Sequence, residues 1–129
     1  MIYLDSSAVV KLVRREAETH ALRAWLAANP QPLVASALAR TETTRALRCV
    51  EPTALPVLAS VLALLHQVPL SDPILDSAAA LADRALRSLD AIHIATAASL
   101  GAGVSWFVAY DRRLAQAAQT EGLAVVSPS

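Results

Sequence analysis

The chain has 129 residues, enough for one hydrophobic core but not for two, so a single domain over residues 1–129 is expected. Its eleven basic and eleven acidic residues give a net charge of zero, which excludes a strong whole-molecule attraction to nucleic acid. Although 55% of the residues are apolar, no uninterrupted apolar run approaches the roughly 18 residues that a membrane span needs. The single cysteine, Cys49, excludes an internal disulfide, fits a cytoplasmic location and is expected in a core or half-buried position.

Strand-like and helix-like patterns alternate along the chain. In the first half, the predicted elements are a strand at 2–4, helices at 8–15 and 16–28, a strand at 32–35, a helix from 36 to about 47 and a helix at 53–65. In the second half, they are a strand at 66–70, helices at 71–86 and 89–100, a strand at 106–109, a helix at 112–119 and a strand at 123–126. Asp5 closes the first strand at once, a start unlike that of a secretory signal peptide. The alternation predicts an α/β sandwich around a mainly parallel sheet.

Four acidic residues stand at positions where a chemical role competes with simple solvation. Asp5 directly follows the first predicted strand, and Asp111 follows the fourth. Because ligands of parallel α/β sheets bind at the carboxyl ends of the strands, both side chains are expected in that region. Glu42 lies on the helix after the second strand, and Asp90 lies in the first turn of a nearly apolar helix.

Each acid also has a purely structural interpretation, which stays open from the sequence. Asp5 and Asp111 can each cap the following helix by accepting hydrogen bonds from its first amides. The helix dipole favours Asp90 in a first turn by about 0.3–1 kcal/mol, and Glu42 can face solvent. Taken together, the acids predict a cluster whose mutual repulsion a divalent cation would relieve. Carboxylates without cysteine or histidine at zinc-ligand spacing favour Mg²⁺ or Mn²⁺, which can activate a water for phosphodiester hydrolysis.

Four sequence blocks resemble the PIN-domain family and, within it, the VapC toxins. The opening MIYLDSSA resembles the family's first block, in which an aspartate ends the first strand and hydroxyl residues follow. Residues 36–42, SALARTE, are similar to the second block, which carries a glutamate on a helix. The most specific match is LDAIHIATA at 89–97, which looks like the VapC signature around the third acid, and FVAYDRRL at 107–114 resembles the fourth block. The blocks occur in family order over nearly the entire chain.

The resemblance implies a three-layer α/β/α fold and an acidic Mg²⁺ site, with Mn²⁺ as a substitute, at which a metal-activated water cleaves RNA. Carried over to this sequence, the acidic set is Asp5, Glu42, Asp90 and Asp111, with Asp5 and Asp90 ranked first as direct metal ligands. Glu42 and Asp111 either ligate the ion or hold its bound water. The resemblance also implies a toxin paired with a VapB-like antitoxin, and a homodimer. Many family members have a hydroxyl residue where this chain has Ala109, so the surroundings of Asp111 depart from the family pattern.

Several further residues are interpreted as supporting ones. His93, three residues after Asp90, is expected on nearly the same helical face as a structural residue or a partner of a metal ligand. Arg112 and Arg113 follow an acid of the site and are candidates for contacts with the RNA backbone. Further candidates for such contacts are Arg14, Arg15, Arg84 and Arg87. The helix at 53–65 is too hydrophobic to be fully solvated, and is expected to contact a second copy or the antitoxin.

Functions of other classes compete with the nuclease. A PIN-like module that binds RNA or protein without cutting would be marked by the loss of an acid, whereas all four positions are filled here. An aspartyl phosphatase would need a second acid where Ser7 stands, and a receiver domain would need a lysine at a late strand end, whereas Lys11 is the only lysine. Dinucleotide and P-loop sites fail because the three glycines form no glycine-rich loop. The expected function is therefore a Mg²⁺-dependent ribonuclease, with the non-catalytic module as the alternative.

Overall fold

Five short strands form one parallel sheet in the computed structural model, which describes residues 1–129. The strands are β1 (Ile2–Leu4), β2 (Leu33–Ser36), β3 (His66–Val68), β4 (Trp106–Val108) and β5 (Val125–Val126), in the order β3-β2-β1-β4-β5. The central strand β1 pairs with both β2 and β4, and places Tyr3 opposite Val34 on one side and Phe107 on the other. This sheet confirms the predicted α/β class.

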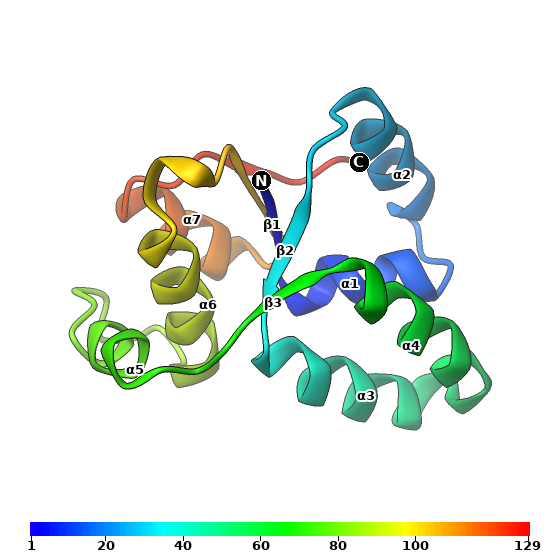
Figure 1. The fold of residues 1–129 in the computed structure, drawn as a ribbon, viewed down its shortest axis with the longest axis horizontal. Helices are drawn as coiled ribbons and strands as arrows, with labels where there is room; N and C mark the ends of the chain where they lie inside the picture. Colours follow the sequence, from blue (N-terminus) through cyan, green and yellow to red (C-terminus); the bar gives the residue numbers. More distant parts are fainter.

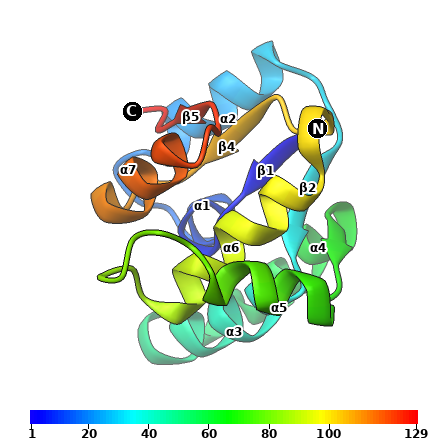
Figure 2. The ribbon, with the colours of Figure 1, turned by 90° about the vertical axis from the view of Figure 1, so that its left-hand side faces the viewer.

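Seven α-helices cover the sheet in two layers. They are α1 (Ser6–Val13), α2 (Thr19–Ala28), α3 (Leu38–Val50), α4 (Leu55–Leu64), α5 (Asp72–Ala79), α6 (Ser88–Ser99) and α7 (Arg112–Thr120), with short 3₁₀ turns at Pro52–Ala54 and Gly101–Gly103. In Figure 1, α5, α6 and α7 lie on the left of the strands and α1 to α4 on the right, and Figure 2 looks onto the α5–α7 layer. The three layers confirm the predicted sandwich. The longest helix, α3, has 13 residues, and no helix combines the length and apolar character needed to cross a membrane.

The alternation of side chains along β1 supplies both halves of the core. Ile2 and Leu4 pack into the cluster beneath α1 to α4, whereas Tyr3 points to the opposite face and packs with Phe107 and Ile94 beneath α6 and α7. All five side chains are fully buried. Because β1 is buried on both faces, the residue that follows it, Asp5, is carried to the middle of the carboxyl edge of the sheet.

Several helix boundaries differ from the predicted ones by a few residues, and for two helices the local cause is visible. Helix α1 begins at Ser6 instead of residue 8, because the Asp5 carboxylate accepts the N–H of Ala8 and caps the helix there. Helix α5 ends at Ala79, far short of residue 86. The side chain of Asp83 accepts the N–H of Ala85 at 2.9 Å, and this local turn competes with a continued helix.

The position of Cys49 was predicted wrongly. It is exposed on α3, not in the core or half-buried. The residues that α3 buries are Ala39, Thr43 and Leu47, which are four apart and form a single stripe along the helix. Cys49, two residues beyond this stripe, falls on the solvent side.

Candidate active site at the carboxyl edge of the sheet

Three of the four predicted acids follow the strands at the centre of the sheet. Asp5 directly follows β1, Glu42 lies on α3 after β2, and Asp111 caps α7 after β4. Because β2, β1 and β4 are parallel neighbours, these three acids start from the same edge of the sheet. Asp90 comes from the first turn of α6, which covers that edge from the other layer.

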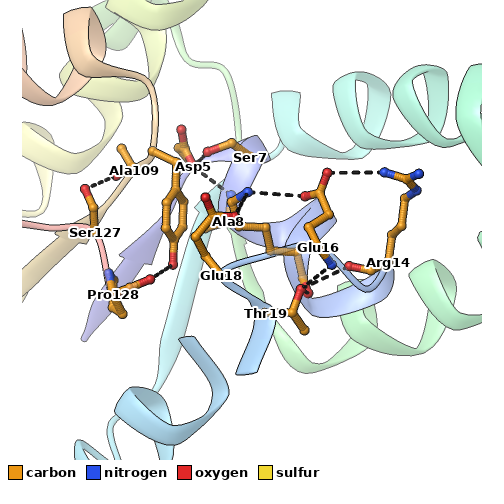
Figure 3. Close-up of polar contacts among 12 residues, drawn as sticks. Asp5, Ser7, Ala8, Arg14, Glu16, Glu18, Thr19, Ala109, Ser127 and Pro128 are labelled. Atoms are coloured by element: carbon orange, nitrogen blue, oxygen red, sulfur yellow. Dashed lines mark hydrogen bonds and ion pairs between the residues drawn. The ribbon is translucent and has the colours of Figure 1, made fainter. Parts of the chain in front are cut away.

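Asp5 is buried and forms no ion pair. Only 3% of its surface is exposed. Oδ1 accepts hydrogen bonds from the Ser7 hydroxyl at 2.7 Å and from the Ala8 N–H at 2.9 Å (Figure 3), and Oδ2 receives none. Burial raises the pKa of Asp5 to about 6, although the two hydrogen bonds and nearby His93 lower it. A buried carboxylate with one free oxygen and a raised pKa is the environment that a cation stabilises.

The two carboxylate oxygens of Asp111 have different partners: the first turn of α7 and the guanidinium of Arg87. Oδ1 accepts the Leu114 N–H at 3.0 Å and caps α7. Oδ2 lies 3.6 Å from a terminal nitrogen of Arg87, and Nε of the same guanidinium lies 3.3 Å from Oδ2 of Asp90. Arg87 therefore joins Asp90 and Asp111 into one acidic pair. Its side chain is 72% exposed, so this bridge is open to solvent and ions.

Glu42 is held from two other helices. The Ser6 hydroxyl donates to Oε1 at 2.5 Å, and Nε2 of His93 lies 2.6 Å from the same oxygen. Burial alone would raise the pKa of Glu42, but the hydrogen bonds from His93 and Ser6 outweigh burial and lower it. The side chain is only 22% exposed. Glu42 is thus a fixed carboxylate at the site and does not simply face solvent.

The acids occupy one edge as two pairs. Glu42 is near enough to Asp5 to raise the pKa of that carboxyl, and Asp90 and Asp111 share Arg87. The pairs meet on α6, where His93 lies one turn beyond Asp90 on the same face. No three His, Cys, Asp or Glu side chains are arranged to hold a metal ion. That the four acids together bind one metal ion therefore stays a prediction.

The structural interpretations of Asp5 and Asp111 are confirmed, and they leave room for a chemical role. Both residues cap a helix through Oδ1 alone. The second oxygen of Asp5 is free, and that of Asp111 faces the exposed Arg87. Capping and metal binding are therefore compatible in one carboxylate, because they use different oxygens.

Some residues that shape the site were not found from the sequence. Tyr3 looked like an ordinary strand residue, yet its hydroxyl lies 2.8 Å from Nδ1 of His93. Ser6 was grouped only with the hydroxyl residues that follow Asp5. Ala109, where this chain departs from the family pattern, is fully buried, and its carbonyl accepts the Ser127 hydroxyl (Figure 3). The only available signals were the serine directly after an acid and the histidine one turn after Asp90.

Lys11, the only lysine, forms ion pairs with two glutamates that follow α1. Its ammonium lies 2.8 Å from Glu18 and 3.3 Å from Glu16, and it stands over the ring of Tyr110. These contacts tie α1 to the segment before α2. They give Lys11 a structural role.

Comparison with known proteins supports the resemblance seen in the sequence. The PIN domain family model matches residues 2–120. Ribonuclease VapC35 of Mycobacterium tuberculosis is 47% identical over 131 residues, which cover 99% of this chain and 97% of that protein. Ribonuclease VapC46 of the same organism is 46% identical over 128 residues, covering 99% and 98% of the two chains.

Solved structures share the fold at lower identity. The crystal structure of Mycobacterium tuberculosis VapC20, described as a Sarcin-Ricin loop cleaving toxin, matches with a TM-score of 0.77 at 19% identity and covers 99% of this chain and 100% of that one. A chain of a toxin-antitoxin complex from Klebsiella pneumoniae matches with a TM-score of 0.73 at 18% identity, covering 100% and 98%. The family match over most of the sequence and the full-length relatives lead to one conclusion: the chain belongs to the PIN-domain family and, within it, to the VapC proteins.

Proposed function

We propose that the chain is a magnesium-dependent endoribonuclease that acts in the cytoplasm as the toxin of a toxin–antitoxin pair. The observation that carries the proposal is the buried Asp5 carboxylate, whose Oδ2 is free, at an edge of the sheet shared with the other three acids. The names of the full-length relatives, which are ribonucleases, support RNA as the substrate.

The donor chemistry supports Mg²⁺, with Mn²⁺ as a substitute. All four candidate side chains are carboxylates, and hard divalent cations prefer oxygen ligands. Asp5 and Asp90 are the proposed direct ligands, and Glu42 and Asp111 either bind the ion or hold its bound water. When bound, the ion supplies the positive charge that activates a water and neutralises the scissile phosphate.

The chain's own residues orient the acids and guide the RNA. Ser7 and the Ala8 amide hold Oδ1 of Asp5 and leave Oδ2 for the site. Arg87, exposed beside the acids, is placed to contact a phosphate of the incoming strand. Arg87, Arg113 and Asp90 line one cavity of about 630 Å³ between α7 and the segment before α6, which is room for a nucleotide beside Asp90.

The experiment is cleavage of total RNA by the purified chain, freed of any bound partner, with Mg²⁺ and then with excess EDTA. Asp5→Asn removes the charge but keeps a capping oxygen. Asp76→Asn is the matched control, because Asp76 is exposed on α5 and its side chain makes no hydrogen bond or ion pair. We expect discrete products that need both the ion and Asp5 and that persist in the control. If the folded chain cuts no RNA class, even with Mn²⁺, the non-catalytic binding module is favoured instead.

The proposed protein partners are a VapB-like antitoxin and a second copy of the chain. Helix α4 exposes Val57 and Leu64, at 48% and 76% of their surface. Exposed apolar side chains that gather on one helix are typical of a protein contact. Sedimentation of the free chain is expected to show a homodimer, which Leu64→Ser weakens. If Leu64→Ser leaves the dimer unchanged, the exposed face of α4 is assigned to the antitoxin instead. Leu64→Ser should then reduce antitoxin binding.

A further inference from the structure

Three successive hydrogen bonds run from the backbone of β2 to the candidate site. The Ser36 N–H lies 3.2 Å from the Tyr3 hydroxyl, and this hydroxyl lies 2.8 Å from Nδ1 of His93. Nε2 of His93 then lies 2.6 Å from Oε1 of Glu42. We call this series, Ser36–Tyr3–His93–Glu42, the relay. It connects β2, β1, α6 and α3, although Tyr3 and His93 are 90 residues apart in sequence.

The Ser36 amide and the Glu42 carboxylate fix the directions of the two end bonds of the relay. A carboxylate can only accept, so Nε2 of His93 donates to Oε1 of Glu42. At the other end, the Ser36 N–H donates to the Tyr3 oxygen, which carries the hydroxyl proton. Burial raises the pKa of Tyr3 well above its usual range, so the phenol keeps that proton. The Tyr3 hydroxyl and Nδ1 of His93 are hydrogen-bonded in the middle of the relay, which leaves Nε2 to face Glu42.

Packing keeps the relay rigid. Tyr3 and His93 expose 0% and 2% of their surface. The Tyr3 ring stacks on Phe107 with centroids 5.0 Å apart and an interplanar angle of 4°, and it meets the His93 ring edge to face at 6.0 Å. Because interiors are close-packed, neither ring can turn without disturbing the core. The orientation of the His93 N–H is therefore determined by the core.

The relay determines which oxygen of Glu42 is available. Oε1 accepts from His93 at 2.6 Å and from Ser6 at 2.5 Å, whereas Oε2 receives no hydrogen bond. The same division occurs in Asp5, where Oδ1 takes two hydrogen bonds and Oδ2 none. In both acids, one oxygen is held by the protein and the other is left for the site.

We propose that Tyr3 and His93 are positioning residues that fix the Glu42 carboxylate for the reaction at this site. Neither is a catalytic residue, because both act through Glu42. The inference rests on the proposed nuclease function, since the orientation of Glu42 matters to cleavage only if Glu42 takes part. Removing a hydrogen-bonding partner of a metal ligand costs about 10–100-fold in metal affinity or activity, and this sets the expected scale.

The direction of the relay is measured without RNA or metal. Nitrogen NMR of the ¹⁵N-histidine-labelled chain reports which ring nitrogen of each of the three histidines is protonated, and His93→Gln assigns the signal by its loss. We expect Nε2 of His93 to carry a proton in wild type, and the Nδ1 signal to shift in Tyr3→Phe, in which Nδ1 loses its hydrogen-bonding partner. A wild-type His93 protonated on Nδ1 alone would overturn the inference, whatever the nuclease assay shows.

Two amide substitutions separate the two ring nitrogens in the functional test. The amide of His93→Gln lies about where Nε2 stands, and that of His93→Asn about where Nδ1 stands. We expect His93→Gln to stay within a few-fold of wild type in kcat and in Mn²⁺ affinity. His93→Asn is expected to lose about 10–100-fold in both, with little change in KM for RNA, and Tyr3→Phe to lose less.

Stability measurements distinguish positioning from a merely structural role. Thermal unfolding is measured for each variant, and activity is compared among variants of equal stability. If the Gln and Asn variants lose activity equally and in proportion to stability, His93 is only a core residue and the inference fails. If Glu42→Gln cleaves RNA like wild type, the proposed nuclease function is retained, but the positioning role of Tyr3 and His93 is contradicted. If wild type does not cleave RNA, the proposed function fails, while Mn²⁺ affinity still decides whether His93 positions Glu42.

Discussion

A terminal nitrogen of Arg87 lies 3.6 Å from Oδ2 of Asp111 and so ties the start of α6 to the start of α7. The same guanidinium lies 3.3 Å from Asp90 through Nε. One exposed cation therefore spans two of the four carboxylates proposed for the metal site. This arrangement suggests competition between Arg87 and a divalent ion for the same charge.

Arg87→Ala is expected to tighten Mn²⁺ or Mg²⁺ binding by less than about tenfold. Removing the guanidinium frees Asp90 and Asp111, but an exposed ion pair contributes only about 0–1 kcal/mol. Titration calorimetry at low salt measures the change, which should shrink at high ionic strength as the pairs are screened. Arg84→Ala is the matched control, since Arg84 is exposed nearby and forms no ion pair. Equal affinities of Arg87→Ala and wild type would show that Arg87 does not compete.

Asp5→Asn is expected to stabilise the metal-free protein at pH 7. Burial raises the pKa of Asp5 from 3.8 to about 6, so the folded state binds this proton more tightly than the unfolded state does. The stability of wild type therefore falls as the pH rises between these two values, by up to about 3 kcal/mol, and levels off above them. Asparagine does not titrate, and it keeps an oxygen for the cap of α1.

The measurement is urea unfolding of both proteins in EDTA at pH 4 and pH 7. The advantage of Asp5→Asn should be present at pH 7 and largely gone at pH 4, where wild-type Asp5 is protonated in the folded state. A variant that is less stable than wild type at pH 7 would mean that the protein already compensates the Asp5 charge.

Mg²⁺ is expected to raise the melting temperature of wild type. An ion that binds only the folded state adds about 2.7 kcal/mol of stability at one hundred times its Kd. Asp5→Asn should lose most of this stabilisation, whereas Asp76→Asn, on the exposed face of α5, should keep it. Differential scanning fluorimetry over a Mg²⁺ series measures the shifts. Equal shifts in all three proteins would indicate non-specific binding to surface acids.

The fold was largely predictable because its strands are short apolar runs between helical patterns. Composition alone did not predict where α5 ends, since residues 80–86 are alanine, leucine, aspartate and arginine, most of which favour helices. Leu81 and Leu86 do pack against α5 and α6, but from a turn held by Asp83. Leu81 and Leu86 can be buried from a helix or from a turn, so packing does not choose between the two. The hydrogen bond of the Asp83 side chain in the turn therefore decides where α5 ends.

The candidate acids could be chosen from the sequence because Asp5 and Asp111 follow strands and Glu42 and Asp90 lie on helices of the resembling blocks. Their partners could not, because those contacts depend on the packing of distant elements. The Tyr3 hydroxyl matters only because α6 places His93 against it, and Arg87 matters only because α7 brings Asp111 within 3.6 Å. The sequence places each residue on an element, but the face that meets its partner is decided by tertiary packing.

Asp111 has a capping role and a proposed chemical role, and two substitutions separate them. Oδ1 caps α7 through the Leu114 N–H at 3.0 Å, whereas Oδ2 belongs to the acidic pair. Asp111→Asn keeps an oxygen for the cap, so its free energy of unfolding should stay near that of wild type, whereas Asp111→Ala should lose about 1 kcal/mol. Both remove the negative charge, so RNA cleavage and Mn²⁺ affinity should fall together in both.

Urea unfolding and RNA cleavage of the two Asp111 variants are measured side by side. The proposed role requires Asp111→Asn to be stable but impaired in cleavage, since only the charge is lost. If Asp111→Asn matches wild type in both assays while Asp111→Ala is weakened in both, Asp111 serves α7 as a cap alone. The acidic set would then reduce to Asp5, Glu42 and Asp90, and Arg87 would have to be interpreted as a partner of Asp90 only.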